Sequence, residues 1–141
     1  MKKVAVIYWS GTGNTQAMAD AVVEGAREAG ADVTLFQVSD FFDSMMDDYD
    51  AFAFGCPAMG DEELEDIEFA PVYDACEMKI SGRTAAIFGS YSWNDGEWIR
   101  KWDARIRNAG AIIAHDYVMC ADYPDDDAIR ACKELGASLA Q

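Results

Sequence analysis

A run of small, hydroxyl-bearing and amide residues follows the first apolar stretch of the chain. Residues 10–15 read SGTGNT, a run that holds hydroxyls, an amide and two glycines but no lysine or arginine. Backbone N–H groups at the start of a helix, together with hydroxyls, form an anion-binding site. The run therefore predicts an anion surrounded by neutral donors only, which are supplied by Ser10, Gly11, Thr12, Gly13, Asn14 and Thr15.

The spacing of this run argues against two common nucleotide sites. A nucleoside-triphosphate loop requires G-x-x-x-x-G-K-[ST], and no lysine is present here. A dinucleotide fingerprint requires a third glycine where Gln16 stands, and the predicted second strand ends in Phe36 and Gln37 rather than in an acid. A terminal monophosphate remains as the ligand. An ordinary capped turn is the alternative interpretation, although six such residues exceed what a helix cap needs.

Two further loops carry unusual residues. Residues 56–62 read CPAMGDE, in which Met59 places a polarizable side chain next to a peptide at Gly60 that can flip. Cys56 lacks the arginine of a C-x5-R phosphatase, because Glu62 stands there. Residues 90–96 read SYSWNDG, and Trp93 in this polar loop is interpreted as a platform on which a flat ring stacks. The alternatives are core filler for Met59 and a surface aromatic for Trp93.

Apolar segments alternate between short β-branched runs and runs with helical spacing. The pattern predicts strands over 4–8, 32–38, 51–55, 83–89 and 111–119, and helices over 14–29, 65–77, 96–109 and 125–140. Pro71 indicates a late start or a break in the second helix, and 39–50 is predicted as a loop with a short helix. This order predicts one α/β domain over 1–141, a doubly wound parallel sheet with helices on both faces. The three loops then meet outside the carboxyl ends of its strands.

Charge and cysteine content narrow the classes of partner and cofactor. The 26 acids and 11 bases give a net charge of −15, which disfavours nucleic acid and anionic membranes and favours a basic protein partner. The four cysteines form no CxxC pair and there is one histidine, so we expect reduced, mostly buried thiols and no metal site. Neither an apolar leader nor an apolar run of about 20 residues is present, which predicts a cytoplasmic protein.

A phosphate site, a thioether and a tryptophan at one sheet edge indicate a flat heteroaromatic monophosphate such as flavin mononucleotide (FMN). With "SGTGNT", "AMGDE" and "FGSYSWNDG" along its length, the chain resembles a flavodoxin of the short-chain type. The resemblance covers the whole chain. It implies a flavodoxin-like fold with five strands in the order 2-1-3-4-5, FMN as cofactor and a monomeric protein.

The resemblance also implies roles for individual residues. Residues 10–15 would hold the FMN phosphate, Met59 and Trp93 would pack on the two faces of the isoalloxazine, and Glu62 would accept a hydrogen bond from the flavin N3–H. The Gly60–Asp61 peptide would turn its carbonyl toward N5. The N1/O2 edge would receive backbone N–H groups near Ser92, Trp93 and Asn94, although relatives often have glycine at Ser92 and Asn94. The remaining implied cofactor contacts are Ala58, Ser90, Tyr91 and Gly96.

The implied function is low-potential, one-electron transfer between redox enzymes, with FMN cycling between its semiquinone and hydroquinone. A hydrogen bond to the Gly60 carbonyl would favour the semiquinone, and the acids at 61–63, 65 and 66 would oppose a second electron. The acidic surface would attract basic redox proteins. One alternative is an FMN-dependent NAD(P)H:quinone reductase, which needs an open flavin face. Another is a flavodoxin-like activator dedicated to one enzyme.

Overall fold

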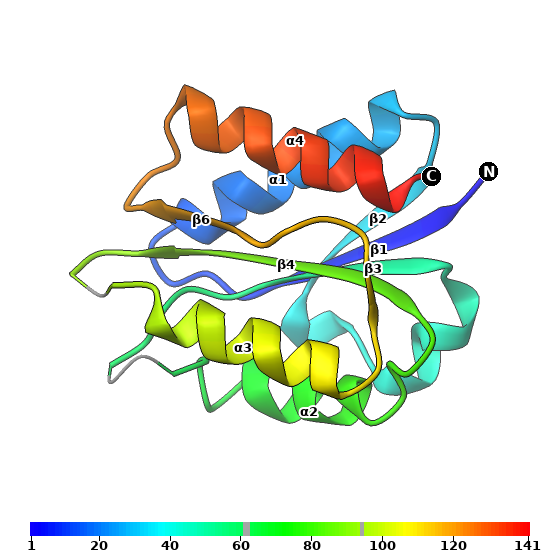
Figure 1. Ribbon diagram of the computed structural model, residues 1–141, viewed down its shortest axis with the longest axis horizontal. Helices are drawn as coiled ribbons and strands as arrows, with labels where there is room; N and C mark the ends of the chain where they lie inside the picture. Colours follow the sequence, from blue (N-terminus) through cyan, green and yellow to red (C-terminus); the bar gives the residue numbers. More distant parts are fainter. Residues whose placement is uncertain (61–62, 94) are drawn as a thin grey trace.

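A parallel β-sheet forms the centre of the molecule in the computed structural model, which describes residues 1–60, 63–93 and 95–141. Its strands run in the order β2-β1-β3-β4-β5, and β6 also pairs with β4 (Figure 1). This order confirms the predicted topology. The strands are β1 (Lys3–Tyr8), β2 (Asp32–Gln37), β3 (Ala51–Gly55), β4 (Thr84–Tyr91), β5 (Ile112–Ile113) and β6 (Val118–Ala121).

The fifth position of the sheet differs from the prediction of one strand over 111–119. β5 pairs only with Thr84 and Ala85, and β6 pairs with the carboxyl-terminal half of β4 and extends to Ala121. Residues 114–117 separate the two segments and include His115, whose Nδ1 lies 2.8 Å from the carbonyl oxygen of Asp116. Pairing with β4 is interrupted between β5 and β6, where one continuous strand was predicted.

Two helices cover each face of the sheet (Figure 1). On one face lie α1 (Asn14–Glu28) and α4 (Asp126–Leu139), and on the other lie α2 (Phe69–Glu77) and α3 (Glu97–Asn108). The second helix begins at Phe69 rather than at Glu65, in agreement with the late start that Pro71 indicates. The predicted short helix between the second and third strands consists of two 3-10 helices, η1 (Val38–Asp40) and η2 (Asp43–Asp48).

Alternate residues of the central strands enter two separate cores. Val4 and Val6 pack toward α1 and α4, whereas Ala5 and Ile7 pack toward α2 and α3. The second core is aromatic, and the predicted stripe of α3 is buried in it as Trp98, Ile99, Trp102 and Ile106. Both cores hold the carboxyl ends of β1, β3 and β4 in fixed register, which positions the loops that follow.

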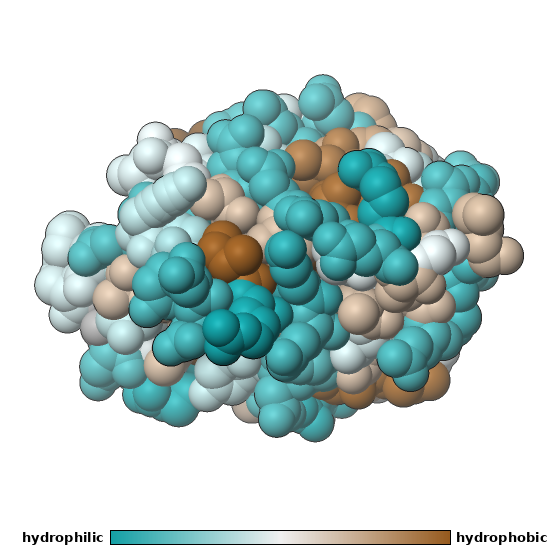
Figure 2. Space-filling model, turned by 90° about the horizontal axis from the view of Figure 1, so that it is seen from above, coloured by the Kyte–Doolittle hydropathy of each residue, from teal (hydrophilic) through white to brown (hydrophobic). Residues whose placement is uncertain are grey.

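The outer surface of α1 and α4 is mostly hydrophilic, as Figure 2 shows in a view onto this layer. All four cysteines are free thiols, and three of them are buried, as predicted. Within residues 1–60, 63–93 and 95–141, no helix combines the length and the apolar character that crossing a bilayer requires.

Candidate functional site

The loops after β1, β3 and β4 line one cavity of about 260 Å³ at the carboxyl edge of the sheet. The sequence predicted that these three loops would meet, and the cavity brings together residues from each of them. Its lining consists of Trp9, Gly11, Thr12, Asn14, Pro57, Ala58, Met59, Ser90, Tyr91, Ser92 and Trp93. Nine of these eleven side chains or backbones were predicted as cofactor contacts, and Trp9 and Pro57 were not.

The first loop is held in shape by its own hydrogen bonds. The Ser10 hydroxyl accepts a hydrogen bond of 3.0 Å from the backbone N–H of Gly13, and Gly13 adopts a φ of 95°, which favours glycine. Thr15 is fully buried, and its hydroxyl lies 2.8 Å from that of Ser90 at the end of β4. Ser10, Gly13 and Thr15 therefore shape the loop and join it to β4 rather than line the cavity.

The amino end of α1 carries no acidic side chain, unlike the amino ends of the other three α-helices. α1 begins after Gly13 with no side-chain cap and with no acid in its first turn. The other three α-helices have carboxylates at this position, which are Glu65 before α2, Asp95 and Glu97 at α3, and Asp125, Asp126 and Asp127 at α4. The first N–H groups of a helix lack intrahelical partners and carry partial positive charge, so the start of α1 can receive an anion.

Two residues of the second loop, Met59 and Glu63, pair with each other beside the cavity. The backbone N–H and carbonyl groups of Met59 and Glu63 bond to each other over 2.9 and 3.0 Å in an antiparallel bridge. Gly60 has a φ of 45°, and a β-carbon added there would meet no atom within 4 Å. Glycine is therefore required at this turn by backbone conformation and not by space. Met59 is half-buried and lines the cavity.

A buried carboxylate fixes the end of this loop. Glu65 accepts hydrogen bonds of 2.7 to 2.9 Å from the backbone N–H groups of Ile67, Glu68 and Phe69, and its own N–H points to the Cys56 sulfur at 3.4 Å. Burial alone would raise the pKa of the Glu65 carboxyl, but these three N–H donors outweigh it and leave the pKa lowered. Glu65 is thus an ionised group under the loop. Burial raises the pKa of the Cys56 thiol to about 12, so that sulfur is a neutral packing group.

The third loop presents an aromatic ring to solvent. Trp93 lines the cavity and is 86% exposed, whereas Tyr91 is half-buried against Trp98. Arg100, in the first turn of α3, donates to the Asp95 carbonyl oxygen over 3.1 Å. Gly96 is buried at the start of α3, where it is a positioning residue and not part of the cavity wall. The sequence had shown no cation in these loops, yet the fold places Arg100 against one of them.

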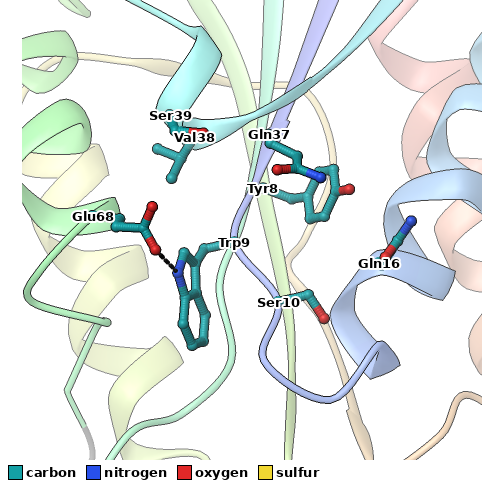
Figure 3. Close-up of a pocket in the computed structure, with 8 residues that line it drawn as sticks. All are labelled: Tyr8, Trp9, Ser10, Gln16, Gln37, Val38, Ser39 and Glu68. Carbon is teal, nitrogen blue, oxygen red and sulfur yellow. Dashed lines mark hydrogen bonds between the residues drawn. The ribbon is translucent and has the colours of Figure 1, made fainter.

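Trp9 is the main functional candidate that the sequence analysis missed. Its indole N–H donates to Glu68 over 3.0 Å, as Figure 3 shows, and its ring lies 3.1 Å from the position of a β-carbon on Gly11. An aromatic residue directly before a polar loop at a strand end was the available signal, whereas Trp93 had been selected because it lies within such a loop.

A smaller crevice of about 130 Å³, the β1–β2 crevice, is also lined by Trp9. It lies at the carboxyl ends of β1 and β2 (Figure 3). Its lining consists of Tyr8, Trp9, Ser10, Gln16, Gln37, Val38, Ser39 and Glu68.

The donor set of the larger cavity fits FMN. The open amino end of α1 and the hydroxyl of Thr12 suit a phosphate, and the thioether of Met59 and the ring of Trp93 suit a flat apolar ring. None of the described residues that line the cavity is a lysine or an arginine. The predicted contacts of Asp61, Glu62 and Asn94 fall outside the described residues.

Comparisons with known proteins agree with the fold described above. The family model described as flavodoxin matches residues 6–136. The chain is 40% identical over 136 residues to a flavodoxin of Clostridium beijerinckii, covering 96% of this chain and 97% of that one. It is also 40% identical over 141 residues to a flavodoxin of Megasphaera elsdenii, covering 98% of each.

A solved structure gives the same result in three dimensions. The solution structure of two-electron reduced Megasphaera elsdenii flavodoxin superposes with a TM-score of 0.89 at 39% identity, over 97% of this chain and 98% of that one. The sequence and structural matches both extend over nearly the full length of each protein. The chain therefore belongs to the flavodoxin family, whose members carry FMN and transfer electrons without a substrate of their own.

Proposed function

We propose that residues 1–141 form one domain that binds FMN in the 260 Å³ cavity and passes single electrons at low potential between redox proteins. The observation that carries this proposal is the open amino end of α1, at the one α-helix start without a carboxylate among the residues described. The dianionic phosphate of FMN would take this position, where Thr12 and Asn14 add neutral donors.

The ring of FMN would lie between Met59 and Trp93. Both side chains line the cavity, and they come from loops that follow adjacent strands, β3 and β4. Trp93 would lose much of its 86% exposure against a bound ring, which would exclude water from that face. A face covered in this way is closed to hydride transfer from a nicotinamide, which supports a carrier rather than a quinone reductase.

Residues around the second loop would control the electron chemistry of the bound flavin, which supplies one-electron steps. Gly60, in the left-handed region, would allow its peptide to turn the carbonyl toward a protonated N5. Glu65 holds a negative charge under this loop, and Glu63 and Asp66 are exposed beside it. These carboxylates would disfavour further negative charge on the ring, while Arg100 near Asp95 would offset part of their effect.

The partners we propose are redox proteins with basic docking surfaces, met by this chain as a monomer in the cytoplasm. The net charge of −15 supports electrostatic attraction of such partners, and the four free thiols suit a reducing compartment. Such encounters are small, weak and sensitive to salt.

The test combines two measurements on the FMN-loaded protein. Under anaerobic conditions we expect reduction in two resolved one-electron steps, and no direct bleaching of the flavin by NADPH alone. Stopped-flow oxidation of the reduced protein by a basic c-type cytochrome should slow as sodium chloride is added. Rapid bleaching by NADPH would favour a reductase, and a rate that ignores salt would contradict electrostatic attraction.

A further inference from the structure

The β1–β2 crevice is lined by groups that accept hydrogen bonds. Ser10 and Ser39 supply hydroxyls and Gln16 and Gln37 supply amides, all of which can accept as well as donate, and Glu68 supplies a carboxylate, which only accepts. None of the residues that line it is a lysine, arginine or histidine. A group that only donates hydrogen bonds and carries positive charge complements this lining, whereas an anion would meet Glu68 without a counter-charge.

The carboxylate of Glu68 is held in place at this crevice. One of its oxygens accepts the indole N–H of Trp9 over 3.0 Å (Figure 3), and its backbone N–H donates to the Glu65 carboxylate over 2.7 Å. A carboxylate fixed at both the side chain and the backbone loses little freedom when it binds a further group. This arrangement favours a planar cation with several N–H donors, which is the geometry of a guanidinium.

The crevice adjoins the proposed FMN cavity. Trp9 lines both, and Ser10 belongs to the loop at the start of α1 while it lines the crevice. A protein that covers the exposed Trp93 edge of the cavity would lie within reach of a second opening on the same edge of the sheet. The phosphate proposed at the start of α1 would further attract a cation in the crevice.

We propose that the β1–β2 crevice binds an arginine side chain of the redox partner, with Glu68 as the counter-charge and Trp9 as the residue that orients it. This inference rests on the proposed function, because the partner is the protein that exchanges electrons with this chain. The crevice would select partners with an arginine at one position of the docking surface, beyond the general attraction of the acidic surface.

The test titrates the FMN-loaded protein with arginine amide at constant ionic strength and follows the indole N–H signals by NMR. The chain has four tryptophans, and the signal of Trp9 is the one lost in Trp9→Phe. We expect this signal to shift with saturation, and Glu68→Gln to weaken arginine amide binding about two- to fivefold, the effect of losing one partly exposed ion pair. Lysine amide should bind more weakly than arginine amide.

Asp40→Asn provides the matched control. Asp40 is an exposed acid next to Ser39 that does not line the crevice, and its replacement removes the same charge as Glu68→Gln. We expect it to leave the affinity for arginine amide nearly unchanged. Equal weakening by the two variants, equal binding of lysine amide, or a Trp9 signal that does not respond would each overturn the proposal.

A failure of the arginine site can be distinguished from a failure of FMN binding. The flavin absorbance of the purified protein is measured before each titration, and Glu68→Gln should keep its bound FMN and its reduction by dithionite. A protein that never binds FMN would contradict the proposed function. A yellow protein whose Trp9 signal ignores arginine amide would contradict only the arginine site.

Discussion

The helices α1 and α4 lie on the same face of the sheet and begin at the same edge (Figure 1), yet their amino ends are built in opposite ways. α4 is capped by Asp125, which accepts the N–H of Ala128 over 2.8 Å, and two more acids follow in its first turn. α1 begins after Gly13 without a side-chain cap or an acid. In a chain with a net charge of −15, the start of α4 is therefore neutralised by its own carboxylates, whereas the start of α1 carries no carboxylate that would repel an external anion.

A carboxylate introduced at the start of α1 should have the largest effect, because it would make this helix start resemble that of α4. Thr12 is exposed and lines the cavity, so Thr12→Asp would put a negative charge beside the proposed phosphate. Two charges about 4 Å apart near a protein surface interact by about 4 kcal/mol, so we expect FMN affinity to fall at least about 100-fold. Fluorescence titration of the cofactor-free protein measures this.

Thr12→Asn is the control, because it has nearly the same shape as Thr12→Asp and no charge. It should retain most of the affinity for FMN. If the two variants bind FMN equally well, the phosphate does not lie at the start of α1.

Removal of the internal carboxylate at α2 should cost stability rather than phosphate affinity. Glu65→Gln leaves buried N–H donors facing an amide, so we expect the free energy of unfolding at pH 7 to fall by about 2–3 kcal/mol. The folded-state pKa of Glu65 is lowered, so its contribution is complete above the unfolded value of about 4.3 and is lost as pH falls through the folded pKa. Urea unfolding of both proteins at pH 7 and pH 3 tests this.

The neighbouring exposed acid Asp66 supplies the comparison for this variant. Asp66→Asn should change stability by a few tenths of a kcal/mol at either pH. A wild-type advantage over Glu65→Gln that persisted undiminished in acid would show that the carboxylate charge is not the source of the stability.

The ring end of the cavity should contribute less to affinity than the phosphate end. Trp93→Ala removes a stacking surface and should weaken FMN binding by about 1–3 kcal/mol, the size of an aromatic stack on a base. Tyr123→Ala removes another exposed aromatic, at 63% exposure, which does not line the cavity, and should leave the affinity unaltered. Unchanged affinity in Trp93→Ala would remove its stacking role.

The smallest effect is expected from removing the carboxylate that caps the start of α4. Asp125→Ala removes the cap of α4 and should lower the free energy of unfolding by about 1 kcal/mol, with FMN affinity unchanged. Thermal unfolding and an FMN titration on the same preparation measure both quantities. A loss of FMN affinity here would mean that the two helix ends do not have separate roles.

The sequence predicted the elements where local patterns decide them. The helix α3 and the short strand β3 were predicted almost residue for residue. The apolar residues of α3 recur on one face at helical spacing, and β3 is a short apolar run that is buried on both faces. The meeting of three loops followed from the rule that parallel strands end at one edge. The fifth strand was misplaced because a short run with His115 and Asp116 in its middle does not reveal where pairing stops.

Contacts between distant residues were beyond sequence reasoning. Trp9 and Glu68 are 59 residues apart, and Thr15 and Ser90 are 75 apart, so no local pattern links them. The sequence analysis treated Glu65 only as one of several acids near the flavin ring. In the structure its side chain is buried and accepts backbone N–H groups at the start of α2. Arg100 lies outside the third loop in the sequence and reaches back to it only because α3 begins at Glu97, directly after that loop.

The most direct test of the account compares FMN with riboflavin, which lacks the phosphate, by NMR of the backbone amides. We predict that both ligands shift the Trp93 indole signal, and that only FMN produces large shifts of the amides of residues 11–16. The amides of Asp126 to Ala128 at the start of α4 should respond to neither. Equal shifts of residues 11–16 with riboflavin, or FMN-specific shifts at α4 instead, would contradict the claim that α1 is left open for the cofactor phosphate.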